Sequence, residues 1–172
     1  MRKFLVGLLV SVAAVVVVGS TAGAGPPAIA TGNWDCSTNV SVTIESSRTV
    51  DGNTIISLSA TGCVYTGDLT GSFSLDGTRV VKSDGSYTHH GHIYCTGCTI
   101  GGRTGDFTGV IAFHSPSPGE VYGNIAVVSA TGGLTGLRAQ AHFERHGPPS
   151  SGTYSYSYSF EPQGALTCIV AA

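Results

Sequence analysis

The chain has 172 residues, of which 25 are glycine and only 10% are charged, and its formal net charge is −2. The basic residues are scattered and form no stripe, so binding to a phosphate backbone, and with it a nucleic-acid partner, is excluded. Beyond the first two dozen residues no stretch places apolar residues at i, i+3, i+4 and i+7, which excludes a helical domain.

The N-terminus reads as an export signal. Two basic residues at 2–3 precede an apolar run over 4–18, and Ala-Gly-Ala at 22–24 is the small-x-small pattern after which signal peptidase cuts. A membrane anchor is the alternative, but the run is short for a bilayer span of about 20 residues. The pattern at 22–24 is preferred over a second one at 28–30. We therefore expect residues 1–24 to be removed and the mature protein to be secreted, without membrane contact.

The rest of the chain has the length of one domain. Residues 25–38 contain two prolines and two glycines, which predicts a flexible leader, so we place the folded domain at residues 39–172. Within it, Val40, Val42 and Ile44 alternate with polar residues, which predicts a half-exposed strand.

Turn-forming residues divide the next hundred positions into short strands. Aspartate, asparagine and glycine tolerate the left-handed backbone of tight hairpin turns. The first half is expected to contain turns at 51–53, 76–77, 84–85 and 101–102, strands at 55–61, 64–75 and 107–113, and a proline-containing loop at 115–119.

The second half repeats this pattern. Strands are expected at 121–127, 137–143, 154–160 and 166–170, with a turn at 132–133 and the longest loop at 148–152. About eight hairpin-linked strands without a helix predict an all-β fold, either a barrel or a sandwich. We favour a single eight-stranded antiparallel barrel, because closure removes the exposed edges of a sheet.

One six-residue phrase occurs three times, as TGDLTG at 66–71, TGDFTG at 104–109 and TGGLTG at 131–136. Each copy leads into an apolar strand, so large apolar residues at matching places should point into one lumen and contact any ligand there. These lumen candidates are Leu69, Phe73, Phe107, Ile111, Leu137 and Phe143. An eight-stranded barrel is just wide enough to be filled or to hold one small ligand, and we expect a narrow, mostly apolar cavity open at one end.

Three of these segments also carry a resemblance. Residues 101–107, residues 131–138 and the Tyr-Ser-Tyr-Ser-Phe strand at 156–160 resemble a bacterial family of unknown function, domain of unknown function 3224. That family is grouped with the allene oxide cyclase-like barrels, and residues 65–69 are similar to a phrase of the plant cyclases. The resemblance spans roughly residues 43–161 and implies an eight-stranded barrel around a small lumen. It transfers no catalytic residue, and Cys95-Thr96-Gly97-Cys98 departs from the family pattern.

All five cysteines lie in the exported part, where disulfides persist. Cys95 and Cys98 could form a structural disulfide, a redox pair or half of a metal site. The structural disulfide is preferred, because the surroundings read as strand and no second pair of metal ligands follows. We expect Cys95 and Cys98 to pair with each other or with Cys63. Cys36 is expected to pair with Cys168, since the first and last strands of a closed barrel are neighbours.

Two groups of histidines, at 89–92 and at 142 and 146, are candidate metal ligands. His90 and His92 should share one strand face and His89 the opposite one, and a metal would need a further ligand from elsewhere. His142 and His146 would lie about 13 Å apart on a strand, at about 3.4 Å per residue, too far to share an ion. A polar, solvent-facing strand is the preferred interpretation, and we expect no metal and no cofactor.

Candidate catalytic groups are few. Asp68 and Asp106 occupy equivalent places in two repeats and could face each other across a lumen, although such aspartates more often bond to the backbone of a turn. Tyr65 is a third weak candidate. The alternating tyrosines Tyr154 and Tyr156 (with Tyr158) could stack on a sugar, a polyphenol or a partner, or could simply form an aromatic strand.

Three classes of function follow. The first is a secreted barrel that binds a small apolar or aromatic molecule in its lumen, without chemistry of its own. The second, implied by the resemblance, is a cyclase or isomerase in which a shaped lumen folds a reactive polyene. The third is an envelope or matrix protein without a ligand. The sequence favours binding over catalysis and gives neither the ligand nor the oligomeric state.

Overall fold

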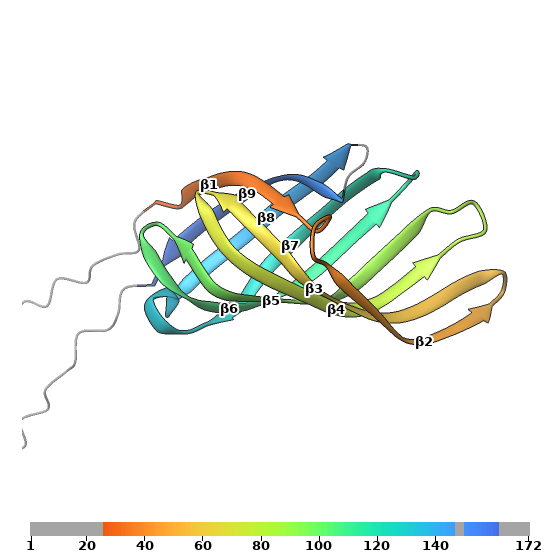
Figure 1. Cartoon of the computed structure of the whole chain (residues 1–172). Helices are drawn as coiled ribbons and strands as arrows, with labels where there is room; N and C mark the ends of the chain where they lie inside the picture. The colour runs from red at the N-terminus through yellow and green to blue at the C-terminus, as the bar shows by residue number, and fades with distance from the viewer. Residues whose placement is uncertain (1–25, 147–149, 162–172) are drawn as a thin grey trace, which may run out of the picture.

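The computed structural model describes residues 26–146 and 150–161, so the export signal, Cys168 and the strand expected at 166–170 lie outside it (Figure 1). The described chain consists of strands and one single-turn 3-10 helix, η1 (Gly132–Leu134). No helix in these two ranges has the length and hydropathy to cross a membrane. The strands are β1 (Ala28–Asp35), β2 (Ser41–Val50), β3 (Asn53–Gly67), β4 (Leu69–Val81), β5 (Tyr87–Ile100), β6 (Arg103–Ser115), β7 (Glu120–Ala130), β8 (Leu137–His146) and β9 (Ser151–Phe160).

These strands close into an antiparallel barrel. The order is β1-β9-β8-β7-β6-β5-β4-β3-β2, and β1 pairs additionally with β3. β1 pairs with the end of β3, residues 64–67, whereas β2 pairs with its beginning, residues 53–61. Strands β1 and β3–β9 therefore form the closed ring of eight strands, and β2 is an additional strand. The predicted eight-stranded antiparallel barrel is confirmed.

The barrel has two different ends (Figure 1). The β2–β3, β4–β5 and β6–β7 hairpin turns lie at one end, which we call the open end. The β3–β4 and β5–β6 turns and η1 lie at the other, the closed end. This distinction decides which side chains reach solvent through the lumen.

The first strand of the barrel was not expected. Residues 25–38 were assigned to a flexible leader, but residues 28–35 form β1 and pair with β9 along their whole length. Its sequence, AIATGNWD, has little apolar alternation. The pairing partners lie far away in the chain, so β1 is held by non-local contacts that no local pattern records. The domain boundary at residue 39 is thereby corrected.

Most of the predicted hairpin turns are present in the structure, and one of these predictions was wrong. The turn at 51–52 has positive φ at both residues, 51° and 77°, as the favoured two-residue hairpin requires. Asp76-Gly77, however, lies inside β4, where Gly77 pairs with Gly91 of β5. The chain turns instead at Asp68, so the expected strand at 64–75 is divided between β3 and β4.

The pairing of Gly77 with Gly91 allows the two strands to approach closely. A Cβ atom at Gly91 would overlap the carbonyl oxygen of Asp76 and lie 2.7 Å from the Cα atom of Gly77. Gly91→Val should therefore lower the free energy of unfolding by about 1–3 kcal/mol, measured by urea denaturation. Thr78→Val, on the exposed face of β4, is the matched control and should change it by less than about 0.5 kcal/mol. Equal effects for the two variants would contradict this account.

Two disulfides join parts of the barrel. Cys36, just after β1, bonds to Cys63 of β3, with a Cα–Cα distance of 4.4 Å. Cys95 bonds to Cys98 within β5. The prediction that Cys36 bonds to Cys168 was wrong. Cys36 directly follows β1, and the pairing of β1 with β3 brings Cys63 next to it. Both disulfides are consistent with an extracellular or periplasmic protein.

The hydrophobic core of the protein occupies the lumen of the barrel. Inward-facing side chains from all eight ring strands form one buried cluster. All six lumen candidates of the sequence belong to it, namely Leu69, Phe73, Phe107, Ile111, Leu137 and Phe143. Large side chains therefore fill most of the barrel, one of the two arrangements that the width of an eight-stranded barrel allows.

Candidate functional site

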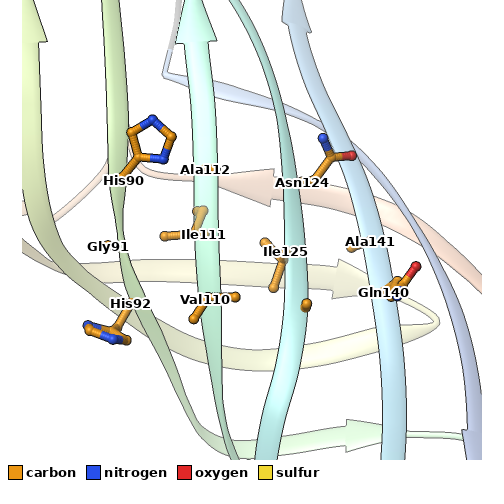
Figure 2. Close-up of a pocket in the computed structure, with 11 residues that line it drawn as sticks. His90, Gly91, His92, Val110, Ile111, Ala112, Asn124, Ile125, Gln140 and Ala141 are labelled. Atoms are coloured by element: carbon orange, nitrogen blue, oxygen red, sulfur yellow. The ribbon is translucent and has the colours of Figure 1, made fainter.

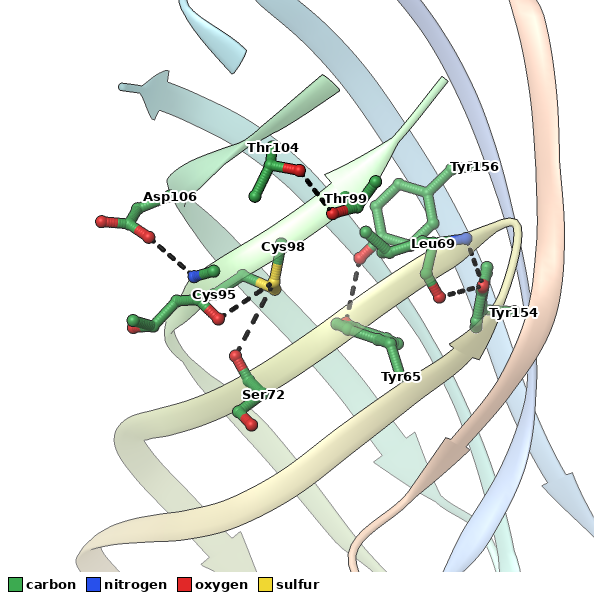
Figure 3. Close-up of a disulfide and its surroundings, with 12 residues drawn as sticks. Tyr65, Leu69, Ser72, Cys95, Cys98, Thr99, Thr104, Asp106, Tyr154 and Tyr156 are labelled. Carbon is green, nitrogen blue, oxygen red and sulfur yellow. Dashed lines mark hydrogen bonds between the residues drawn. A yellow bond between two sulfur atoms is a disulfide. The ribbon is translucent and has the colours of Figure 1, made fainter. Parts of the chain in front are cut away.

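Three buried tyrosines, Tyr65, Tyr154 and Tyr156, lie together near the β3–β4 turn at the closed end of the lumen (Figure 3). The hydroxyls of Tyr65 and Tyr156 lie 3.0 Å apart. The Tyr154 hydroxyl accepts a hydrogen bond from the Leu69 amide at 2.9 Å and lies within donating distance of the Leu69 and Thr66 carbonyls. Burial raises the pKa of Tyr65 and of Tyr156, so both phenols stay protonated. Tyr154 and Tyr156 of β9 therefore face the core, and neither ring is free to stack on a ligand at the surface.

The Tyr154 hydroxyl should contribute measurably to stability, because it satisfies the buried amide of Leu69 at the start of β4. Tyr154→Phe is expected to lower the free energy of unfolding by about 1–3 kcal/mol, the cost of leaving a buried donor without a partner. Tyr158→Phe, on the same strand, is the control and should have a smaller effect. Thermal unfolding of both variants tests this, and an unchanged midpoint for Tyr154→Phe would refute it.

The two candidate aspartates are exposed and do not line the lumen. Asp68 accepts hydrogen bonds from the backbone amide of Thr31 at 2.9 Å and from its hydroxyl at 3.2 Å. Asp106 accepts one from the amide of Gly97 at 2.8 Å (Figure 3). Asp68 therefore joins the β3–β4 turn to β1, and Asp106 of β6 holds the bulge of β5. The hypothesis of an acid–base pair across the lumen is corrected.

The Cys95–Cys98 disulfide spans a bulge in β5. Cys95 pairs with Phe107 and Cys98 with Gly105 of β6, so the two residues between the cysteines have no partners in the β5–β6 ladder. Both cysteines are almost fully buried, and a Cβ at Gly71 would collide with Cys98. A buried bridge on a strand, without a helix N-terminus to activate a thiol, fits the structural interpretation.

A small cavity opens near the open end of the lumen, with a volume of about 50 Å³. Its walls are mostly apolar, and half of the residues that form them are aromatic. The residues that line it are Trp34, Cys36, Tyr65, Phe73, Leu75, Ile93, Ile111, Phe113, Ile125 and Phe143. Trp34, Leu75 and Phe113 are only partly buried, whereas Phe143 is buried, so the cavity faces solvent on one side. Phe143 makes edge-to-face contacts with Trp34 and Phe113, at centroid distances of 6.1 Å and 5.9 Å.

Three of the described residues at this end carry buried polar atoms without partners: Trp34 lines the cavity, His89 stacks on Phe113 of its wall, and Arg79 is the register partner of His89. Among the described residues, the atoms so placed are the Trp34 indole nitrogen, Nε of Arg79 and both ring nitrogens of His89. Buried polar groups are bonded in the large majority of cases, and leaving one unbonded costs about 1–3 kcal/mol. The open end therefore carries polar groups that the described protein residues do not satisfy.

His89 is fully buried, with 0% of its surface exposed, and its ring stacks on Phe113 at 4.6 Å between centroids. Burial, together with the positive charge of Arg79, lowers the pKa of His89 to about 4. The nearby Asp76 backbone opposes this shift, but it makes no hydrogen bond of good geometry with the ring. The imidazole is therefore neutral at physiological pH.

The outer wall of the barrel has a wider, shallow groove over β5–β8, of about 630 Å³ (Figure 2). His90 and His92 flank it from β5, and Asn124 and Gln140 border it from β7 and β8. His90 and His92 share this face while His89 points inward, as predicted from the alternation of strand residues. Within residues 26–146 and 150–161 no three side chains of histidine, cysteine or acid type form a possible metal site. The groove is an open surface without unpartnered buried polar groups.

Sequence reasoning missed the roles of Trp34, Arg79 and His89. Trp34 lay in the assumed leader, and Arg79 was counted only as one scattered basic residue. His89 was predicted to lie opposite His90 and His92, but no role was predicted for it. The alternation backward from Ile93 and Gly91 to His89 was the available signal, because it puts a histidine on an apolar face.

No family model matches this sequence, and no curated protein matches it. The fold is similar to a crystal structure of a protein of unknown function from the DUF3224 family of Shewanella oneidensis MR-1, with a TM-score of 0.62 and 21% identity. The similarity covers 79% of this chain and 99% of that chain. The grouping with allene oxide cyclase-like barrels stays a prediction. At the level of the fold, this similarity confirms the resemblance to the DUF3224 family seen in the sequence.

Proposed function

We propose that this protein is an exported β-barrel that binds a small apolar or aromatic molecule at the open end of its lumen. The observation that carries the proposal is the partly exposed aromatic cavity formed by Trp34, Phe113 and Phe143. Aromatic walls with a few polar groups at one side are typical of small-molecule sites. Offset and edge-to-face contacts with these rings would stabilise an aromatic ligand beyond simple burial.

The size of the cavity determines where such a ligand sits. Small-molecule sites usually have volumes of about 300–1,000 Å³, whereas the cavity inside the barrel has about 50 Å³. A ligand would therefore place only one edge in the lumen and rest the remainder against Trp34 and Phe113 at the open end. This differs from the expectation of a ligand enclosed in the lumen, because Phe73, Phe107 and Phe143 fill that space.

No observation favours the cyclase alternative. Asp68 and Asp106 bond to backbone amides outside the lumen, and Tyr65 is buried against Tyr156. The ligand-free envelope or matrix protein is the alternative that a negative binding experiment would support.

The proposal includes export of the protein from the cytoplasm. The N-terminal pattern predicts signal cleavage, and two disulfides support an oxidising compartment for the folded chain. Both disulfides would be reduced in a typical cytosol. The ligand is therefore expected to be one that is present outside the cytoplasm.

Trp34 is the only tryptophan of the chain, so its fluorescence reports directly on the open end. Titration with N-phenyl-1-naphthylamine, a neutral aromatic probe, should quench Trp34 emission in a saturable way. Phe113→Leu removes one aromatic wall and should weaken binding about 3- to 10-fold, the equivalent of one aromatic contact. Tyr122→Leu, an aromatic truncation on the outer face of β7, is the matched control and should leave affinity unchanged.

Two results would overturn the proposed function. One is the absence of saturable quenching by the neutral probe. The other is probe binding that Tyr122→Leu weakens and Phe113→Leu does not, because this would place the site on the outer wall.

A further inference from the structure

Arg79 and His89 are neighbours on the inner face of the barrel at its open end. They are partners in the register of β4 and β5, and both side chains point inward. The His89 ring stacks on Phe113, which lines the aromatic cavity. The Arg79 guanidinium lies over the ring of Tyr87 at 4.5 Å from its centroid. The polar pair is thus held by aromatic rings at the border of the cavity.

This end of the lumen has hydrogen-bond donors without acceptors. Nε of Arg79 and the indole nitrogen of Trp34 are buried donors that have no partner among the described residues. Neutral His89 carries one further N–H, and neither of its ring nitrogens is bonded there. A ligand that satisfies this end must therefore offer acceptor atoms.

The charge at this end is positive and has no matching acid in the described part of the chain. The nearest acidic side chain in sequence, Asp76, points to the outer face, where it contacts His92 and accepts a hydrogen bond from Tyr94. None of the ion pairs formed within the described residues involves Arg79. A second arginine, Arg145, lies close enough for its charge to lower the pKa of Arg79, in addition to the larger effect of burial.

The hydrogen-bond partners of Arg145 are neutral groups, so they bring no negative charge to this end. Its Nε donates to the carbonyl of Gly119 at 3.1 Å, and one terminal nitrogen lies 3.3 Å from the Ser150 hydroxyl. Two guanidinium groups therefore lie near each other at the open end, and neither forms an ion pair with a carboxylate of residues 26–146 and 150–161. Such an arrangement is unfavourable in the free protein and becomes favourable when an anion binds.

We propose that Arg79 and His89 bind the acid group of the ligand, and that the ligand is therefore a small apolar or aromatic carboxylate. This inference rests on the proposed function, because it assigns the body of the same molecule to the aromatic cavity. An ionised carboxylate accepts hydrogen bonds and donates none, and its planar shape matches the guanidinium fork. Placed at Arg79, it also neutralises the positive charge that two arginines create.

The experiment compares two probes of nearly equal shape. Naphthalene-2-carboxylate carries the acid, and naphthalene-2-carboxamide is its neutral counterpart. Both are titrated at pH 7 into the folded, disulfide-bonded protein, with Trp34 fluorescence and calorimetry as readouts. The acid is expected to bind at least about tenfold more tightly, the effect of one charge-assisted hydrogen bond.

Two variants locate the acid group. Arg79→Met keeps the length of the side chain and should weaken binding of the acid at least about tenfold while changing amide affinity less than twofold. His89→Phe keeps the stack on Phe113 and should also weaken only the acid. Arg48→Met, on exposed β2, is the control and should change neither affinity.

The outcomes separate the two proposals. Equal affinity of the wild-type protein for acid and amide overturns this inference and leaves the proposed function intact. An acid preference that survives Arg79→Met also overturns it. Failure of N-phenyl-1-naphthylamine to quench Trp34 emission in a saturable way overturns the proposed function itself.

Discussion

Replacing both Cys36 and Cys63 with alanine is expected to lower the free energy of unfolding by about 3.5 kcal/mol. The bond joins residues 27 positions apart, and a cross-link of that span removes chain entropy from the unfolded state by about this amount. It also holds β1 against β3, where the ring of strands closes. The loss should be visible as a lower urea midpoint under oxidising conditions.

The second disulfide provides the control. Cys95 and Cys98 are 3 positions apart, so replacing both with alanine should cost only about 1.6 kcal/mol in chain entropy. Peptide mapping without reductant should recover the 36–63 and 95–98 links in the wild-type protein. Equal losses in the two double variants, or a Cys36–Cys168 link, would contradict the closure described above.

The stability of the barrel should fall as the pH is lowered from about 6.5 to about 4. The pKa of His89 is about 4 in the folded chain, whereas its ordinary value is 6.5. Between these values the unfolded chain binds the proton and the folded chain does not, so stability rises with pH. The contribution is complete above about 6.5 and is lost toward 4. A depression of this size corresponds to about 3 kcal/mol at most.

His89→Phe isolates this effect from other titrating groups. The variant keeps an aromatic ring on Phe113 and removes the two buried nitrogens that lack partners. It should flatten the pH dependence between 4 and 6.5 and should raise stability at pH 7. His90→Phe, one residue away on the outer face, is the matched control and should retain the wild-type slope. A slope that is the same in His89→Phe and in the wild type would refute the buried, neutral state of His89.

Much of the fold could be predicted because its signals are local. Alternation of apolar and polar residues over 137–143 and 154–160 identifies strands, and Asp51-Gly52 identifies a hairpin turn. The same local rule failed at Asp76-Gly77, where the pairing with Gly91 decides the conformation. β1 was missed for the same reason, since its partners in β9 and β3 are distant in sequence.

The candidate site was only half predictable. Repeats and alternation place Phe73, Ile111 and Phe143 toward the lumen, and all three line the cavity. The polar part depends on the register of β4 against β5, which brings Arg79 beside His89. It depends equally on which end of the lumen the tyrosines fill. No local sequence pattern indicates the strand register or the filled end, so the pairing of Arg79 with His89 could not be predicted from the sequence.

The most direct test of the account is a crystal structure of the protein grown with naphthalene-2-carboxylate. We predict the naphthalene ring against Trp34, Phe113 and Phe143 at the open end, with its carboxylate at Arg79 and His89. A ligand bound instead in the outer groove beside His90 and Gln140, or an open end that stays empty under saturating probe, would contradict it.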